Sequence, residues 1–214
     1  MTQAELEVRW EQAEKLAGRP APDLRMTEAQ FEKWLDEDIR AEWVNGKVII
    51  MAPASSEHIS LNGWLWHVVD GFVEHDDLGQ VLAIESQIRL PKVRRNPDLL
   101  FVAKSRSRIV KATYVDGPPD LIMEIVSPDS ESRDWREKYS NYESGGVREY
   151  WIIDPSSKHV EAYSLGRDKR YKQIEENDDQ IFSKVLRGFY LRPQWLWKSP
   201  LPKVAVVLKE LGAR

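Results

Sequence analysis

The sequence predicts an α/β fold, in which helices cover a mixed β-sheet. Short apolar segments of strand length, such as residues 97–103 and 120–126, are interspersed with longer segments whose apolar residues recur at the helical period. The segment 120–126 is apolar on both faces, as expected of a strand at the centre of a sheet covered on both sides. The predicted order of helix, hairpin, helix, three strands, helix, strand and hairpin is typical of an α/β protein.

The composition is that of an ordinary globular protein. With 214 residues, of which 42% are hydrophobic and 31% charged, the chain has enough apolar material for one core. The absence of cysteine excludes disulfides and thiolate metal sites. The first residues lack the apolar stretch of a signal peptide, and no apolar run reaches the roughly 18 residues that a membrane helix needs. We therefore expect a cytoplasmic protein with no membrane association.

Both ends of the chain are expected to lie outside the main domain. Apolar residues at the helical period predict a helix over 2–17, which glycine and proline residues then end. We expect an N-terminal helical extension at 1–22, a main domain at 23–194, and a C-terminal tail at 195–214 that packs on the domain through a closing helix.

The main domain is predicted to begin with a short helix and a hairpin. Thr27 and Gln30 have the spacing of a capping box and predict a helix over 27–36. Residues 40–51 predict a β-hairpin, because the Asn-Gly dipeptide at 45–46 is the strongest short-range signal for a hairpin turn.

A buried helix and three strands are expected next. Ser55 or Ser56 caps a helix whose apolar band is too wide for an exposed position. The strands that follow span residues 79–90, 97–103 and 120–126, with a loop at 105–119. The remaining elements are a helix at 132–144, a strand at 149–154 and a hairpin at 159–175.

Two acidic residues lie on the apolar strands. Asp98 precedes the apolar run of the first strand, and Glu124 lies inside the second. A carboxylate in such a strand is costly to bury without a metal, a cation or a proton. If the strands are neighbours, the two acids converge on one divalent cation, Mg²⁺ or Mn²⁺, with the backbone carbonyl of Ile125 as a further ligand. A metal held there activates a bound water and neutralises charge at a phosphate.

The lysine that would complete a nuclease motif is missing from the second strand. A PD-(D/E)xK nuclease has it two residues after the glutamate, where this chain has Val126. Lys138 is the candidate replacement, since it shares one helix face with Asp134 and Tyr142. Two alternatives remain open: a surface ion pair of Lys138 with Asp134, or a structural pair of Lys138 with Glu124.

Basic residues gather around Asp98. Residues 92–111 contain seven Lys or Arg against this one acid, a local charge of +6, although the whole chain carries −4. A stretch of this kind attracts phosphate groups. The residues expected to contact nucleic acid are Arg94, Arg95, Arg106 and Arg108. A solvated loop with surface cations is the alternative.

Several segments taken together resemble the Uma family of restriction-endonuclease-like proteins. The family pattern has a Pro-Asp strand, a Pro-Asp-Leu strand with Glu and Ser-Pro, a helix with Lys and Tyr, and a Glu-Tyr-Trp strand that ends in Asp-Pro. The matching residues are Pro97, Asp98, Pro119, Asp120, Glu124, Ser127, Pro128, Lys138, Tyr142, Glu149, Tyr150, Trp151, Asp154 and Pro155, with Glu42, Gly46, Pro53 and His58 upstream. The resemblance covers residues 27–165.

This resemblance implies a restriction-endonuclease-like fold, a central mixed sheet flanked by helices. It also implies that Asp98 and Glu124 are metal ligands and that Lys138 is the catalytic lysine, moved from strand to helix. The auxiliary candidates are Glu42, His58 and Tyr142.

We therefore expect a metal-dependent endonuclease that hydrolyses phosphodiester bonds in nucleic acid, DNA above all. A homodimer is expected, because a duplex has two strands to cut. The alternative is a non-catalytic nucleic-acid-binding or assembly module on the same fold. A hydrolase of a small phosphorylated or nucleotide substrate is a third interpretation, since a net charge of −4 matches long duplex DNA poorly.

Overall fold

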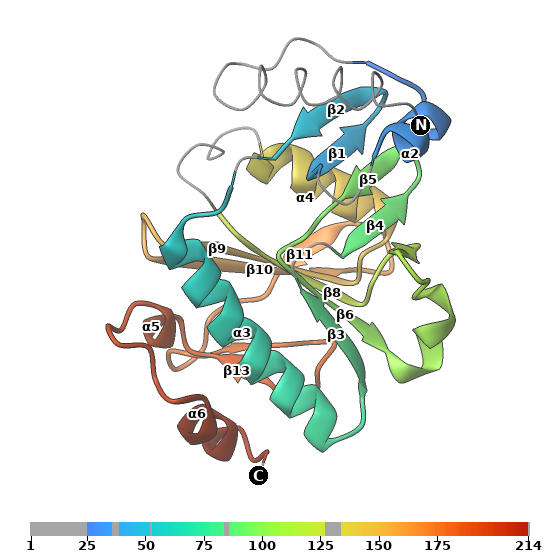
Figure 1. The fold of residues 1–214 in the computed structure, drawn as a ribbon. Helices are drawn as coiled ribbons and strands as arrows, with labels where there is room; N and C mark the ends of the chain where they lie inside the picture. The colour runs from blue at the N-terminus through green and yellow to red at the C-terminus, as the bar shows by residue number, and fades with distance from the viewer. Residues whose placement is uncertain (1–24, 36–38, 52, 84–85, 127–133, 214) are drawn as a thin grey trace.

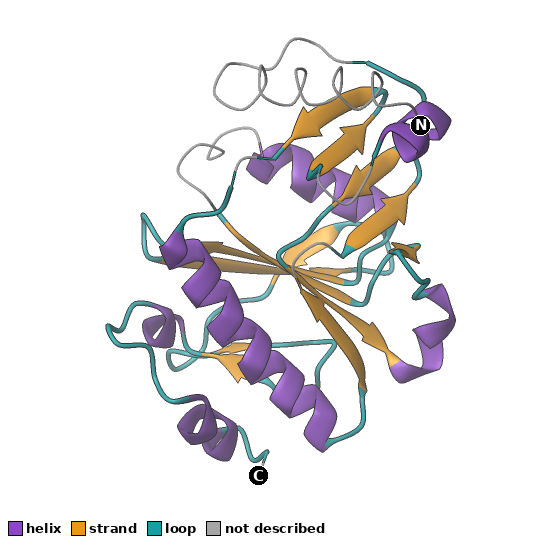
Figure 2. Ribbon diagram, viewed as in Figure 1, coloured by secondary structure: helices purple, strands orange, loops and turns teal. Residues whose placement is uncertain are grey.

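A six-stranded sheet lies at the centre of the computed structural model, which describes residues 25–35, 39–51, 53–83, 86–126 and 134–213. On one side of this sheet lie α3 (Ser56–His75), α5 (Pro193–Leu196) and α6 (Val204–Glu210) (Figure 1). On the other side lie α4 (Asp134–Gly145) and a second, smaller sheet, and Figure 2 shows how the strands of both sheets stand between the helices. The α/β class and the flanked mixed sheet are therefore confirmed.

The central sheet has the strand order β11-β10-β9-β8-β6-β3. Its strands are β3 (Gly79–Ala83), β6 (Leu99–Ala103), β8 (Leu121–Ile125), β9 (Glu149–Asp154), β10 (His159–Leu165) and β11 (Tyr171–Gln173). β8 and β9 run parallel, and the other neighbours run antiparallel. β8 is buried along its whole length, as its two apolar faces predict.

The second sheet has the order β2-β1-β5-β4-β7. Its strands are β1 (Ala41–Val44), β2 (Lys47–Ile50), β4 (Gln87–Leu90), β5 (Val93–Arg95) and β7 (Tyr114–Asp116). The predicted hairpin is confirmed: β1 pairs with β2 across Asn45 and Gly46, whose φ angles of 50° and 90° are the left-handed values that such a turn requires.

The remaining elements are α2 (Glu28–Trp34), the 3₁₀ helix η1 (Lys104–Ile109), β12 (Ile181–Phe182) and β13 (Tyr190–Leu191). α2 begins at the predicted capping box. The Thr27 hydroxyl accepts from the Gln30 backbone N–H, and the Gln30 side chain accepts from the Thr27 backbone N–H.

Each face of the central sheet contributes to a separate core. The face toward α3 packs residues such as Phe101, Met123 and Trp151 against the helix's apolar band. The opposite face packs Leu100 and Ile122 against α4 and the second sheet. Alternation along β8 therefore places Glu124 on the face toward α4, because Ile122 lies two residues before it.

Two predicted elements differ from the structure. The single strand expected at 79–90 is two strands, β3 and β4, in different sheets. The loop expected at 105–119 contains part of η1 and all of β7. The physical reason is shared: β4 and β7 pair with each other in the second sheet, which the apolar pattern alone does not separate from the first.

The predicted ends of the chain are only partly described. The helix expected at 2–17 lies outside the described residues. The closing helix of the tail is confirmed as α6, and its Val207 packs into the core shared with α3. The expected division at 194–195 falls inside α5. Within the described ranges, no helix is long and apolar enough to cross a membrane.

Candidate active site

Asp98 is held between two elements. It lies directly before β6, and its Oδ1 is 2.9 Å from Nε2 of His58, in the first turn of α3. Its Oδ2 accepts a hydrogen bond of 2.8 Å from the backbone N–H of Ile125 in β8. Because β6 and β8 pair antiparallel with Leu99 opposite Met123, Asp98 and Glu124 come from neighbouring strands, as expected from the sequence.

Both carboxylate oxygens of Glu124 contact side chains of α4. Oε2 is 2.9 Å from Nζ of Lys138, and Oε1 accepts a hydrogen bond of 2.6 Å from the Tyr142 hydroxyl. All three side chains are buried. Lys138 and Tyr142 are one helical turn apart, so a single face of α4 is directed at Glu124. The helix thus brings a lysine beside Glu124, and its role as the replacement for the lysine absent at Val126 stays a prediction. The side chain of Asp134 lies outside the described residues.

Burial sets the protonation of this cluster. Burial raises the pKa of Glu124 from an ordinary value of 4.5 to about 7, and the negative charges of Asp98 and Glu42 add to this effect. The charge of Lys138 and the Tyr142 hydrogen bond act in the opposite direction. Burial also raises the pKa of Tyr142 well above its usual value, so its hydroxyl stays a proton donor.

His58 is tuned by its acidic partner. The hydrogen bond with Asp98 raises the pKa of His58, against the effect of its burial. The imidazole is therefore easier to protonate than a free one, and as a cation it would fix the orientation of the Asp98 carboxylate.

Glu42 is tied to the second sheet. Its Oε2 is 2.5 Å from a guanidinium nitrogen of Arg95, and its Oε1 accepts from the backbone N–H of Asn96 at 3.0 Å. Arg95 has no exposed surface and also contacts Asn141 and Glu137 of α4. The charge of Glu42 is therefore balanced by a buried arginine, and it also raises the pKa of Glu124.

The predicted nucleic-acid contacts need a correction. Arg94 and Arg95 are only 1% and 0% exposed. Arg94 pairs with Glu28 and Glu32 of α2, so both arginines join structural elements and present no surface to a phosphate. The reason is that they lie on opposite faces of β5, each facing a packed helix.

The other two predicted contacts lie nearer the surface. Arg106 is partly exposed and makes a 2.9 Å ion pair with Asp120, a fully buried acid that Arg148 also contacts. Arg108 is exposed. Nucleic-acid contact by these two residues stays a prediction.

Metal binding by Asp98 and Glu124 stays a prediction. Among the described residues, no group of three or more His, Asp or Glu side chains is placed to hold a metal ion. The auxiliary role of His58 and Glu42 likewise stays a prediction. The structure shows the N–H of Ile125 bonded to Asp98, and the ligand role of its carbonyl stays a prediction.

Sequence reasoning missed two asparagines beside the site. Asn141, three residues after Lys138, accepts from Arg95, and Asn62, four residues after His58, donates to the backbone oxygen of Asp98 at 3.1 Å. Helical spacing from the motif residues was the signal that could have found them.

A mixed sheet that brings together an acid before one strand, an acid inside its antiparallel neighbour and a lysine from the flanking helix defines a restriction-endonuclease-like protein. The chain belongs to the Uma2 family, described as "Putative restriction endonuclease", which it matches over residues 28–194.

A solved structure supports the fold. The chain is similar to a crystal structure described as that of "a putative nuclease belonging to DUF820 from Anabaena variabilis ATCC 29413", with a TM-score of 0.70 and 19% identity. The match covers 80% of this chain and 97% of the other. No curated protein matches.

Proposed function

We propose that this protein is a metal-dependent endonuclease that hydrolyses phosphodiester bonds in nucleic acid, with DNA as the expected substrate. The observation that carries the proposal is the 2.9 Å contact between Nζ of Lys138 and Oε2 of Glu124. It provides the acid and the lysine of the nuclease motif together, although the lysine comes from a helix. Membership of the Uma2 family points the same way.

The carboxylates fit a hard divalent cation. Burial raises the pKa of Glu124 and the negative charge of Asp98 raises it further, so a cation bound between the two carboxylates would favour their charged forms. Two carboxylates with waters are a usual protein ligand set for Mg²⁺ or Mn²⁺. A bound metal would supply Lewis acidity at the phosphate and lower the pKa of a coordinated water.

The residues of the chain have separable tasks in such a reaction. Lys138 places an ammonium beside Glu124, where it can orient the attacking water and balance charge that develops on the phosphate oxygens. Tyr142 donates to Glu124 and fixes the rotation of its carboxylate. His58 and the Ile125 N–H hold the two oxygens of Asp98. This positioning limits the rearrangement needed when substrate binds.

The test is cleavage of labelled DNA and RNA with Mg²⁺ or Mn²⁺, and with EDTA. Asp98→Asn, Glu124→Gln and Lys138→Met are expected to lower the cleavage rate by a factor of at least about 100, in line with losses of positioned catalytic groups. Lys172→Met, which removes an exposed lysine paired with Asp168, is the matched control and should retain activity. Wild-type rates in all three site variants would contradict the proposal.

A specific observation favours the non-catalytic alternative. Both carboxylate oxygens of Glu124 already have hydrogen-bond partners inside the protein, as expected of an ion pair with a purely structural role. Calorimetry with Mn²⁺ distinguishes the two functions. A stoichiometric Mn²⁺ site lost in Glu124→Gln supports the nuclease, while salt-sensitive DNA binding without any Mn²⁺ site supports a binding module.

Two narrower expectations depend on the same experiments. A homodimer stays a prediction, which sedimentation in the presence of DNA tests. A small phosphorylated or nucleotide substrate is the third candidate, and cleavage of a nucleotide ester without cleavage of DNA or RNA would favour it.

A further inference from the structure

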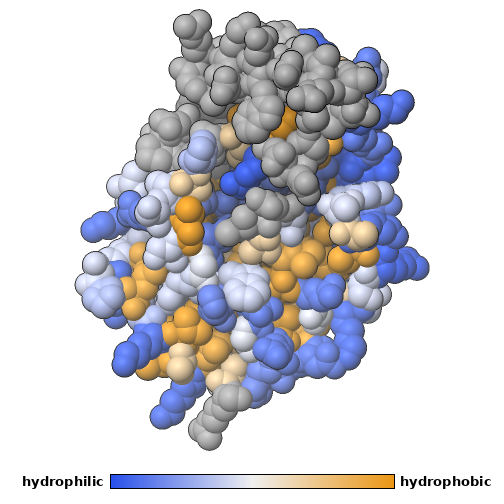
Figure 3. Space-filling view, in the orientation of Figure 1, coloured by the Kyte–Doolittle hydropathy of each residue, from blue (hydrophilic) through white to orange (hydrophobic). Residues whose placement is uncertain are grey.

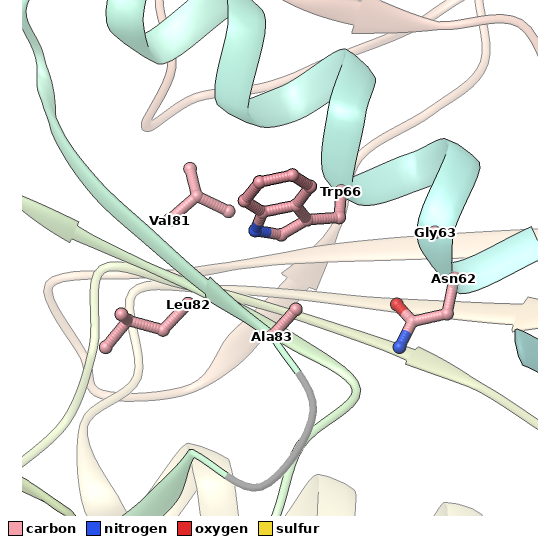
Figure 4. Close-up of a pocket in the computed structure, with 6 residues that line it drawn as sticks. All are labelled: Asn62, Gly63, Trp66, Val81, Leu82 and Ala83. Carbon is pink, nitrogen blue, oxygen red and sulfur yellow. The ribbon is translucent and has the colours of Figure 1, made fainter.

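A pocket lies between α3 and the edge strand β3. Its volume is about 370 Å³, toward the lower end of the range of ligand sites in proteins. The lining residues are Asn62, Gly63, Trp66, Val81, Leu82 and Ala83 (Figure 4). In the space-filling view, apolar surface lies alongside α3 near β3 on this face of the molecule (Figure 3).

Asn62 brings an unused hydrogen-bond acceptor to this pocket. Its side chain is 2% exposed, and its Nδ2 donates to the backbone oxygen of Asp98 at 3.1 Å. A carbonyl oxygen only accepts, so this contact fixes the orientation of the amide. The Oδ1 atom then faces away from Asp98 and has no hydrogen-bond partner among the described residues. A buried acceptor without a donor is costly and calls for an explanation.

The rest of the pocket offers a flat apolar surface. Trp66, one turn after Asn62 on α3, is half-buried, and Figure 4 shows its indole ring between α3 and β3. The Asn62 oxygen is directed toward the same space (Figure 4). Val81 and Ala83 form the wall on the strand side. An indole face with one acceptor beside it suits a planar ring that carries a donor at its edge.

The pocket adjoins the candidate active site through Asn62. One end of the Asn62 amide bonds to Asp98 and the other end is at the pocket. His58, which holds the Asp98 side chain, lies one turn before Asn62 on the same helix. A group in the pocket would therefore lie beside Asp98, one of the two proposed metal ligands.

We propose that this pocket binds one unpaired nucleobase with an exocyclic amino group, stacked on Trp66 and donating to Oδ1 of Asn62. This inference rests on the proposed nuclease function and names its substrate class. A base can enter such a pocket only when it is outside the duplex stack. The substrate is accordingly single-stranded nucleic acid, or a duplex with an unpaired nucleotide beside the cleavage position.

The test measures binding in EDTA, so that no cleavage occurs. Fluorescence anisotropy compares labelled thymidine oligonucleotides of about 12 nucleotides, within the range of single-strand sites. Their central base is adenine, or purine, which lacks only the amino group. Wild-type protein should bind the adenine oligonucleotide several-fold more tightly than the purine one, and Asn62→Leu should bind both equally. Equal binding by the wild type overturns the proposal without recourse to any variant.

Substitutions of Trp66 test the proposed stacking of the base on its indole ring. Trp66→Leu should weaken binding of the adenine oligonucleotide on the order of tenfold, the usual effect of removing one stacking partner. Trp66→Phe should retain most of the affinity. Phe182→Leu, an exposed aromatic residue of β12, is the matched control and should bind like the wild type. Equal affinity of Trp66→Leu and wild type would overturn the stacking role.

Cleavage is measured separately with Mn²⁺, so the two proposals can fail independently. Efficient cleavage with no preference for adenine over purine would refute the base pocket and leave the nuclease intact. A clear preference without cleavage in any metal would keep the pocket and assign it to a binding protein.

Discussion

The guanidinium of Arg95 lies 2.5 Å from the carboxylate of Glu42, and both side chains are buried. This contact joins β5 to β1, and Arg95 also reaches Asn141 on α4. It therefore connects the second sheet to the helix that provides Lys138. Removing one partner of a buried ion pair leaves the other charge without compensation.

Arg95→Met should consequently destabilise the protein by about 3–5 kcal/mol, measured as the free energy of unfolding in urea. Arg170→Met, which breaks the exposed contact with Glu143, is the matched control and should change stability by less than about 1 kcal/mol. A similar small loss for both variants would mean that the buried pair contributes no more than a surface pair.

The pH dependence of the free energy of unfolding should show the titration of Glu124. Its folded pKa is raised from 4.5 to about 7, so the protonated acid stabilises the fold. That contribution is complete below pH 4.5 and is lost as the pH rises through about 7. In the wild type, the free energy of unfolding should fall by on the order of 1–3 kcal/mol as the pH rises from 4.5 to about 7. Glu124→Gln, measured in EDTA, should not show this fall. Glu210→Gln at the surface should leave the decline unchanged, and an identical decline in Glu124→Gln would contradict the assignment.

Removal of the Tyr142 hydroxyl should act on both stability and metal binding. Tyr142→Phe leaves Oε1 of Glu124 buried without its 2.6 Å donor, at a cost of about 1–3 kcal/mol. Because this hydrogen bond lowers the pKa of Glu124, its loss should raise that pKa further. A metal ligand must be deprotonated, so the midpoint of Mn²⁺ binding, followed by calorimetry, should move to higher pH. Tyr163→Phe, on β10, is the control and should leave the midpoint where it is.

Gly79 should tolerate no side chain. A Cβ atom there would lie 2.2 Å from the backbone oxygen of Val102 and 2.8 Å from the backbone nitrogen of Lys104. Gly79→Ala should separate β3 from β6 locally and lower the thermal midpoint by several degrees, as a loss of about 2 kcal/mol would do. Gly63→Ala on α3, where nothing lies within 4 Å, should be neutral or stabilising.

The positions of Glu124, Lys138 and Tyr142 could be predicted from the sequence, because they follow from the regular periods of a strand and a helix. Alternation in β8 placed Glu124 on one face, and the four-residue spacing placed Lys138 and Tyr142 together. The structure brings these three side chains into contact. The resemblance to the Uma family supplied the rest of the assignment, because strand and helix patterns alone do not say which elements are neighbours.

The burial of Arg94 and Arg95 could not be predicted, because a very short strand shows too few residues for its alternation to be recognised. β5 has only three residues, so its arginines looked like surface cations in a basic stretch. The break between β3 and β4 left no signal of this kind. Residues 81–84 are all apolar, so the sequence shows no alternation there that could change phase before Ile88 and Leu90.

The connection through α4 also has a consequence for folding order. α4 links the parallel strands β8 and β9, so Lys138 and Glu124 are separated by 14 positions along the chain. Contacts of such short range form early, because little chain entropy is lost in closing them. His58 reaches Asp98 across 40 positions, and Arg95 reaches Glu42 across 53. One half of the site can therefore assemble within a single β-α-β unit, while the other half is completed only when α3 and the hairpin dock.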